Sequence, residues 1–540
     1  MIKENTAQTE REVSVTVDPF ESEKIIRLLP KTRSRILRLI FSRFAVILFL
    51  IISQIMIIAM IYGLFTEFIP RFKFVQWVFT ISMVLFLFNS DMESSAKLTW
   101  LWLIAMFPVP GSLLLWFTGK NFGSRRIRRR VNDLIAETKT ALPQDEAVIT
   151  AEEITASGTD DLCRYLNRTG CFPMYDKAAV SYCPDGAEMF EAMMRELEKA
   201  EHFIFMEFFI IAEGYMWGRV LSLLSEKAKQ GVDVRVLYDG MCEISSLSFD
   251  YPQRMEKLGV RCKDFSPVRP FLSTHYNYRD HRKIVVIDGK TAFTGGINLA
   301  DEYINRKERF GHWKDAGIML KGEAVRSFTL MFLQMWNISE PQAEWEPFIS
   351  APADPQPAEG WVIPYADCPL DTDKVAENVY INMLYRANAY VHIMTPYLIL
   401  DGELETALKY AAQRGVNVEL ILPGIPDKRS AYALAKTHYR TLLEAGVKIY
   451  EYTPGFVHAK AVVCDDIKAV VGTINLDYRS LYHHFECAAY LYKVPCIAEI
   501  EQDFQQTRTK CRAVTPETIK NESLFYKLLG GFLKIFSPLM

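Results

Sequence analysis

The sequence predicts an α/β protein of two similar halves that face each other, preceded by an N-terminal transmembrane helical anchor. Three observations lead to this fold class. Long apolar stretches lie near the N-terminus, short apolar runs alternate with amphipathic helical patterns from about residue 150 onward, and this α/β pattern occurs twice. A chain of 540 residues also exceeds the ~250–300 residues that one hydrophobic core can organise.

Three apolar stretches form the predicted anchor, namely Phe44–Phe65, Phe74–Phe88 and Leu98–Phe117. The first has about 20 residues without a charge, the length that a helix needs to cross a ~30 Å hydrocarbon layer. It is not a cleaved signal peptide, because a long segment precedes it and no small-residue cleavage site follows. The second stretch is short and the third contains Pro108, so either could be interfacial or re-entrant.

Basic clusters flank this region on both sides, and basic flanks are typical of the cytoplasmic face. They comprise Lys31, Arg33, Arg35, Arg38 and Arg43 before it, and Lys120, Arg125, Arg126, Arg128, Arg129 and Arg130 after it. We therefore expect two crossings, a multi-pass protein of the cell membrane, and a catalytic region that faces the cytoplasm. The clusters could also bind anionic lipid head groups, or simply be solvated. Ten cysteines without a regular framework agree with a reducing compartment.

The composition along the chain suggests six segments. They are a basic N-terminal tail (1–43), the membrane anchor (44–118), a basic linker (119–150), the first half (151–350), a Pro-rich linker (351–365) and the second half (366–540). In the first half, Phe203–Phe208 and Val234–Tyr238 are predicted strands, with a predicted amphipathic helix over Tyr215–Lys229 between them.

The two halves repeat each other in order along the chain. GVDVRVLYDG from Gly231 matches GVNVELILPG from Gly415, and MEKLGVRCKDF around Gly259 matches LLEAGVKIYEY around Gly446. A duplication of two large units predicts similar halves that face each other. A site between them would then draw equivalent residues from both.

One repeated motif carries chemistry, HRKIVVID over His281–Asp288 and HAKAVVCD over His458–Asp465. In each copy the histidine and the lysine are two residues apart, so on a strand both side chains point to the same face. The apolar, β-branched residues that follow favour a strand. A single strand histidine is usually structural, but the same spacing at repeat-equivalent positions indicates function. A lysine there is costly to bury unless an anion accompanies it.

Two imidazoles and two ammonium groups that converge from two halves suit phosphoryl chemistry. A histidine with a pKa near 6.5 can act as nucleophile when neutral and as acid when charged, so the pair could divide these roles. The repeat does not say which histidine takes which role. Lys283 and Lys460 would hold phosphate oxygens. No metal is expected, because the sequence has no HExxH, paired-cysteine or aspartate-cluster spacing.

Further polar residues follow each motif at corresponding places. Asn298 in GGINLADEY and Asn475 in GTINLDYRS could donate to a phosphate oxygen, or could serve a turn. Asp315 in HWKD and Glu486 in HHFE follow the motif histidines of their own copies, His281 and His458, by 34 and 28 residues. Each could accept a hydrogen bond from the second ring nitrogen of its histidine and fix its tautomer. The alternative is that both are surface carboxylates.

The duplicated HxKxxxxD motif with its trailing GGxN and GTxN resembles the phospholipase D superfamily. The stretches SAKLTWLWLIAMFPVPG, DHRKIVVIDGKTAFTGGINLADEYIN, RFGHWKD and PGFVHAKAVV and the terminal SPLM are similar to bacterial cardiolipin synthases, and the resemblance covers all but the first 40 or so residues. The third apolar stretch departs from the two that many members of this family have.

This resemblance implies transfer of a phosphatidyl group from one phosphatidylglycerol to another, with release of glycerol, through a phosphatidyl-histidine intermediate and without a cofactor. It assigns His281 as nucleophile and His458 as acid and base. By the same resemblance, phosphate would be bound by Lys283, Lys460, Asn298 and Asn475, the histidines would be oriented by Asp315 and Glu486, and the motif would be completed by Asp288 and Asp465, which more plausibly support the site than react.

Two alternative enzymes use the same chemistry, a hydrolytic phospholipase D and a phosphatidyltransferase with another acceptor alcohol, because acceptor choice depends on pocket shape. A nuclease is disfavoured by the net charge of -3 and by the predicted anchor. A non-catalytic lipid-binding scaffold would be expected to have lost a histidine or lysine, and neither copy has. The expected partners are thus phosphatidylglycerol and anionic membrane lipid, with no nucleic acid. The sequence carries no indication of the oligomeric state.

Overall fold

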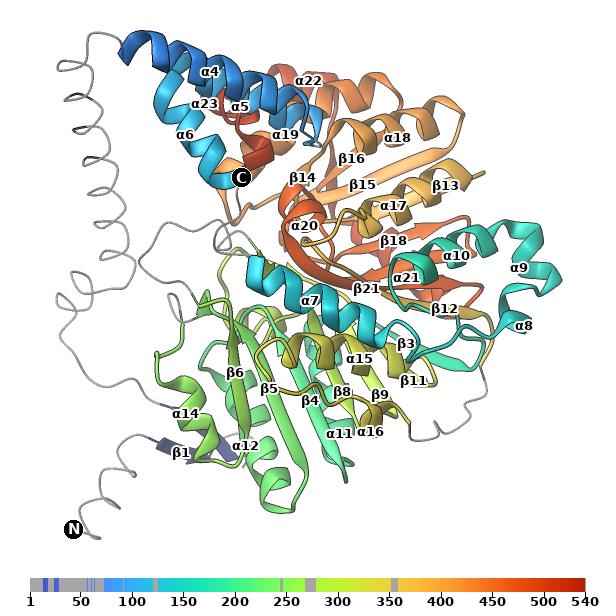
Figure 1. Ribbon diagram of the computed structural model, residues 1–540. Helices are drawn as coiled ribbons and strands as arrows, with labels where there is room; N and C mark the ends of the chain where they lie inside the picture. The colour runs from blue at the N-terminus through green and yellow to red at the C-terminus, as the bar shows by residue number, and fades with distance from the viewer. Residues whose placement is uncertain are drawn as a thin grey trace.

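The computed structural model contains two large β-sheets, each surrounded by helices, which meet along the middle of the molecule (Figure 1). The structure describes residues 13–17, 24–28, 56, 60, 63, 72–90, 92–119, 125–242, 246–267, 278–350 and 358–539. The mixed α/β architecture with two halves agrees with the fold class that the sequence predicts.

The first half is built on a seven-stranded sheet. Its order is β3 (Ala178–Cys183), β11 (Gly317–Gly322), β9 (Thr291–Gly295), β8 (Lys283–Ile287), β4 (Phe203–Phe208), β5 (Asp233–Asp239) and β6 (Arg261–Phe265). The strands β4, β5 and β6 run parallel, and the others pair antiparallel. Helices on its faces are α11 (Gly186–Leu197), α12 (Tyr215–Lys229), α14 (Tyr251–Glu256) and α15 (Val325–Trp336). Because helices cover both faces, β4 and β8 are buried along their whole length.

The second half repeats this order and adds an edge strand. Its path is β12 (Trp361–Asp367), β21 (His484–Tyr492), β19 (Lys468–Gly472), β18 (Ala461–Cys464), β13 (Tyr390–Met394), β15 (Asn417–Pro423), β16 (Lys448–Tyr452) and β22 (Cys511–Ala513). Its helices include α17 (Val375–Arg386), α18 (Gly402–Gln413), α19 (Arg429–Glu444) and α21 (Ile497–Thr509). The repeated sequence motifs thus correspond to the same strand order in both halves.

Short strands cross between the halves in both directions. β7 (Arg279–Asp280) of the first half pairs in parallel with the start of β21, and β17 (Gly455–Val457) of the second half pairs in parallel with β10 (His312–Lys314). One hydrophobic core cluster includes residues of both halves, such as Phe328 and Val471. Backbone hydrogen bonds and a shared core therefore fix the halves relative to each other.

The region predicted as a membrane anchor forms a helical layer in its described part. Its helices are α4 (Phe72–Phe88), α5 (Ser94–Met106) and α6 (Pro108–Gly119). The third predicted stretch is divided at Phe107, because the residue before a proline avoids the helical conformation. Within the parts of the chain that the structure describes, none of the helices combines the length and apolar character that a membrane crossing requires. The first predicted span, Phe44–Phe65, lies outside the described residues except at positions 56, 60 and 63.

Two segments differ from the sequence expectation. The predicted tail contains an antiparallel pair of strands, β1 (Val13–Val17) and β2 (Lys24–Leu28), and β2 packs on α12. The predicted basic linker is largely helical, because α7 (Arg125–Thr138) buries Val131 and Leu134 and packs against α15. Alternating apolar residues in VSVTV were the signal for the first of these strands.

The aspartates that end the repeated motif hold the neighbouring strands in place. Asp288 accepts hydrogen bonds from the backbone N–H groups of residues 201, 202 and 203, at 2.7–2.8 Å. Asp465 does the same for residues 388, 389 and 390, at 2.7–2.8 Å. Each therefore satisfies the backbone that enters the central strand of its half, β4 or β13.

We expect Asp465→Asn to destabilise the second half. The amide nitrogen would face the N–H of Asn388 instead of accepting from it, at a cost of about 1–2 kcal/mol. This lowers the midpoint of thermal unfolding by roughly 2–6 °C. Asp466→Asn is the matched control, because Asp466 also has a positive φ but, within the described part of the chain, its side chain accepts only from the Tyr390 hydroxyl. Equal midpoints for the two variants would contradict this role of Asp465.

Candidate active site

The two motif histidines lie where the crossing strands bring the halves together. His281 follows β7 and precedes β8, whereas His458 follows β17 and precedes β18. Both side chains are buried, with relative exposures of 6% and 7%. After burial and Lys283, the charge of Lys460 from the second half also lowers the pKa of His281, as expected for groups at one site.

Each histidine is bound by a carboxylate of the opposite half. His281 Nδ1 lies 2.9 Å from Glu486 Oε1 and 3.0 Å from Oε2, and His458 Nδ1 lies 2.7 Å from Asp315 Oδ2. In sequence each carboxylate follows the histidine of its own half, but the strand pairs β7–β21 and β17–β10 exchange the partners. Neither half therefore contains a complete histidine–carboxylate pair.

Both carboxylates are fully buried and have further donors. Glu486 also accepts from Ser480 Oγ at 2.6 Å and from Thr473 Oγ1, while Asp315 accepts from the Ala316 N–H at 2.9 Å and Trp313 Nε1 at 3.3 Å. An ionised carboxylate can only accept, so Nδ1 carries the proton in each pair and Nε2 keeps its lone pair. This is the tautomer that an Nε2 nucleophile or base requires.

The two motif lysines bring positive charge to the same place. Lys283 Nζ donates to the carbonyl of His281 at 2.5 Å, and Lys460 Nζ donates to the carbonyl of His458. Among the described residues neither ammonium group forms an ion pair, although their relative exposures are only 1% and 2%. Burial lowers the pKa of Lys283 to about 8 and that of Lys460 to about 7. Two buried ammonium groups without a counterion make this a place for an anion.

Both imidazoles are neutral at neutral pH. Burial and the charge of Lys283 hold the pKa of His281 well below 6.5. Burial and Lys460 lower the pKa of His458 to about 4, against the opposing effect of Asp315. A bound phosphate anion would oppose the lysine charges and raise both values.

The remaining predicted residues are placed differently. Asn298 uses its amide within the first half, because its Oδ1 accepts from the Ile210 N–H at 3.0 Å and its Nδ2 donates to the Tyr303 hydroxyl at 2.8 Å. Asn475 is buried and its Oδ1 has no partner among the described residues. The structure does not bring Asp288 and Asp465 to the histidines, since they follow the opposite ends of β8 and β18.

His484 is a site residue that the sequence reasoning missed. Its ring centroid lies 5.4 Å from that of His281, its Nδ1 lies 3.8 Å from Glu486 Oε1, and neither ring nitrogen has a hydrogen-bond partner in the described structure. Trp313 is its counterpart, with a ring centroid 5.3 Å from that of His458. The signal was the spacing in HHFE, which puts residues two apart on one face of a strand.

Among the residues that the structure describes, two groups of side chains could hold a metal ion. In the active site, His281, His484 and Glu486 place ligand atoms within 4.8 Å of one another. The other group, at Glu377, Asp401 and Glu403, lies on α17 and at the start of α18. Neither group forms a local sequence motif. The ligands of the first come from both halves, and in the second Glu377 is far in sequence from Asp401 and Glu403.

We expect His458 to take up a proton only near pH 4 in the free protein. Asp315→Asn should lower this pKa further, because the negative charge of Asp315 favours the imidazolium. Histidine ¹⁵N chemical shifts measured against pH would report both values, with Asp466→Asn as a control remote from the site. A midpoint near 6.5 in the unaltered protein would contradict the burial of this ring.

Comparison with solved structures supports the fold. The phosphatidylserine synthase of Haemophilus influenzae aligns with a TM-score of 0.54 and 16% identity, over 71% of this chain and 98% of that chain. At this identity the likeness concerns the fold alone.

Sequence comparisons extend over most of the chain. An uncharacterized protein of Streptococcus mutans is 54% identical over 85% of this chain and 100% of its own length. The cardiolipin synthase of Geobacillus kaustophilus is 34% identical over 86% of this chain and 92% of its own length. The family model described as "Cardiolipin synthase, PLD-like domain" matches residues 193–336 and 380–508, which include both motifs. The chain therefore belongs to the phospholipase D-type cardiolipin synthase family and is an enzyme of the phosphatidyltransferase class.

Proposed function

We propose that the protein makes cardiolipin by moving a phosphatidyl group from one phosphatidylglycerol to the hydroxyl of another, with release of glycerol. The observation that carries the proposal is the pair of neutral histidines, each bound through Nδ1 to a carboxylate of the other half, beside two buried lysines that form no ion pair within the described structure. Relatives named cardiolipin synthase support the choice of phosphatidylglycerol.

The reaction would proceed in two balanced steps. In the first, His281 Nε2 attacks phosphorus, a P–N bond forms, the P–O bond to glycerol breaks, and protonated His458 gives its proton to the leaving oxygen. In the second, His458 takes the proton from the hydroxyl of another phosphatidylglycerol, a new P–O bond forms and the P–N bond breaks. Lys283 and Lys460 would stabilise the charge on the phosphate oxygens throughout.

The electrostatics favour His281 as the nucleophile. Burial and Lys283 hold the pKa of His281 well below the ordinary value, which favours its neutral, nucleophilic form, whereas the charge of Asp315 opposes the effects of burial and Lys460 that lower the pKa of His458. Asn298 would hold the loop at Ile210 by accepting from its N–H and would fix the Tyr303 hydroxyl by donating to it. The Oδ1 of Asn475 has no partner among the described residues, which leaves that side chain able to turn toward a phosphate. Asp288 and Asp465 would support the strands only.

We further propose that the enzyme is attached to the cell membrane and faces the cytoplasm. The apolar stretch Phe44–Phe65 and the helical layer α4–α6 would attach it, and the flanking basic clusters would lie against anionic lipid. A phospholipid substrate requires such a position, because its acyl chains stay in the bilayer. The alternative activities are hydrolysis and transfer to another alcohol. Each would give a product other than cardiolipin, so product analysis distinguishes them.

The purified enzyme with labelled phosphatidylglycerol should yield cardiolipin and glycerol, identified by mass. His281→Ala and His458→Ala should each lower turnover by about 10³-fold or more. Activity should survive EDTA, because charge stabilisation comes from Lys283 and Lys460. The matched control is Asp466→Asn, which should retain full turnover.

Phosphatidic acid as the sole product would instead identify a hydrolase. Complete loss of activity with EDTA, restored by one divalent metal, would show that an ion at His281, His484 and Glu486 takes part in the reaction.

A further inference from the structure

The C-terminal helix α23 (Leu524–Lys534) carries large apolar side chains on the side that faces away from the protein. Leu524, Phe525, Leu528 and Phe532 have relative exposures of 69%, 60%, 66% and 57%. Their spacing places all four within one arc of the helix. A surface helix normally turns such a stripe toward the core, so the orientation of α23 needs a cause.

Close packing on the other side sets this orientation. Gly530 is the one buried residue of α23, and a Cβ atom there would lie 2.4 Å from the carbonyl oxygen of Ala433 on α19. Leu533, on the same side, packs against the cluster that contains Leu434 and Tyr478. The helix therefore cannot rotate to bury its outer residues without losing the glycine contact with α19.

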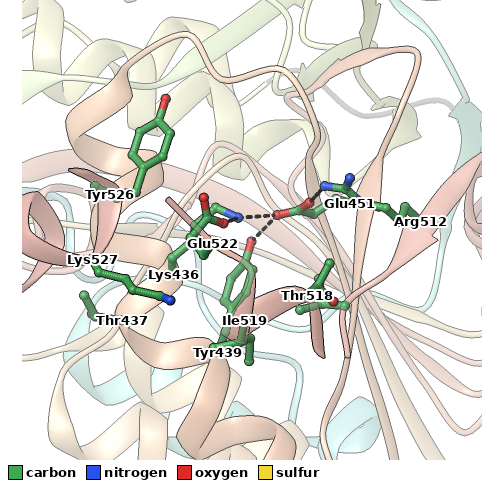
Figure 2. A pocket seen from close by; sticks show the side chains of 12 residues that line it. Lys436, Thr437, Tyr439, Glu451, Arg512, Thr518, Ile519, Glu522, Tyr526 and Lys527 are labelled. Carbon is green, nitrogen blue, oxygen red and sulfur yellow. Dashed lines mark hydrogen bonds and ion pairs between the residues drawn. The ribbon is translucent and has the colours of Figure 1, made fainter. Parts of the chain in front are cut away.

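A network of charged groups holds the base of the helix in the same position. Figure 2 shows Lys436 of α19 next to Glu451 of β16, with Arg512 of β22 on the far side of Glu451. Lys436 also binds Glu522, which lies two residues before α23. Tyr526 and Lys527 of α23 line the same pocket as this network (Figure 2). The inner side of α23 is therefore occupied by the protein, and its outer side is presented in a fixed direction.

The helical layer α4–α6 lies beside α23 at the same end of the molecule (Figure 1). Directly after α23, the carbonyl of Ile535 accepts from Thr99 Oγ1 of α5 at 2.6 Å, and Phe536 packs edge-on to Trp102 at 5.2 Å. On α4, exposed residues include Phe74, Trp77, Leu85, Phe86 and Phe88, with relative exposures of 51–68%. Soluble monomers rarely expose so large an apolar surface.

Charge beside this apolar face indicates which partner it meets. Lys520 at the end of α22 (Pro516–Lys520) and Lys527 and Lys534 of α23 are exposed. Lys527 and Lys534 are two helical turns apart, and Lys527 Nζ donates to the carbonyl of Lys520 at 2.8 Å, so the three lysines form a basic edge. An apolar stripe next to a lysine edge is the pattern of a helix that lies in the interface of an anionic membrane. A flat bilayer would contact the exposed apolar side chains of both α23 and α4, whereas a protein partner could bind to one of these helices alone.

We propose that α23 lies in the headgroup layer of an anionic bilayer, with Leu524, Phe525, Leu528 and Phe532 inserted, and that together with α4–α6 it fixes the height of the active site above the membrane. This rests on the proposed function in that the substrate is a phospholipid. The helix is thus a second membrane contact, near the opposite end of the chain from the apolar N-terminal region.

Fluorescence at single introduced cysteines tests the insertion. The full-length protein is reconstituted into vesicles with phosphatidylglycerol, and an environment-sensitive dye is attached in Leu528→Cys or Phe532→Cys. The native cysteines are buried or half-buried, and the unsubstituted protein gives the blank. We expect quenching by nitroxide-labelled lipid and not by aqueous iodide. The matched control is Glu191→Cys on α11, whose side chain is 72% exposed and which should respond only to iodide.

Quenching of the dye at residue 528 by iodide alone would overturn the proposal, because the face would be in water. Protection from both quenchers would also overturn it, because residues 44–65 or a second copy of the chain would cover the face. The quenching measurement does not depend on turnover, so membrane insertion of α23 can be shown even with an enzyme that proves inactive. An active protein with an iodide-accessible helix would refute the insertion alone.

Vesicle titrations separate the apolar and the charged contribution. Leu528→Glu should raise the lipid concentration for half-maximal activity about tenfold or more on every vesicle type, because it removes one apolar anchor and adds a charge. Lys520→Glu should do so only on anionic vesicles and less at high salt. Turnover of a short-chain, monomeric phosphatidylglycerol should stay unchanged in both variants. Equal titrations for Leu528→Glu and the unaltered protein would contradict the proposal.

Discussion

The contact on which the active site depends is the hydrogen bond between a histidine of one half and a carboxylate of the other, formed twice. Glu486 and Asp315 are completely buried, and a buried carboxylate is tolerated only when its oxygens are satisfied. Here the donors are a histidine from across the interface and neighbouring groups of the carboxylate's own half. Separation of the halves would leave both carboxylates without their main partner, so the assembled interface and the reactive tautomer form together.

The crossing strands give this contact its geometry. Because β7 extends the sheet of the second half and β17 pairs with β10, each histidine leaves its own strand directly opposite the foreign carboxylate. The two aspartates of the motif act at the other end of the same strands, where they bind the backbone that enters β4 and β13. In each copy of the motif, the reactive histidine lies before the strand and the structural aspartate lies after it.

Several features of this arrangement could be predicted from the sequence. The strand Phe203–Phe208 and the helix Tyr215–Lys229 have the predicted bounds, because their apolar periods are long and regular. The repeat around Gly231 and Gly415 correctly indicated two similar sheets. Lys283 and Lys460 were singled out by the cost of burying a lysine, and both are buried.

Other features could not be predicted, because they depend on contacts between distant segments. The exchange of carboxylate partners follows from the pairing of two- and three-residue strands, which have no periodicity of their own. His484 acquires its neighbours only when β21 meets the first half. The outward face of α23 follows from one glycine contact, and apolar periodicity alone predicts the opposite orientation.

The most direct test of the account is to trap the phosphatidyl-enzyme and locate it. His458→Ala should still load a phosphatidyl substrate with a good leaving group, because such a group needs little protonation. After denaturation at alkaline pH, where a phosphoramidate bond survives, the lipid phosphate should be found on the peptide that contains His281. His281→Ala should form no adduct. An adduct on His458 in that variant would contradict the assigned roles, and the absence of an adduct from both variants would contradict the two-step transfer.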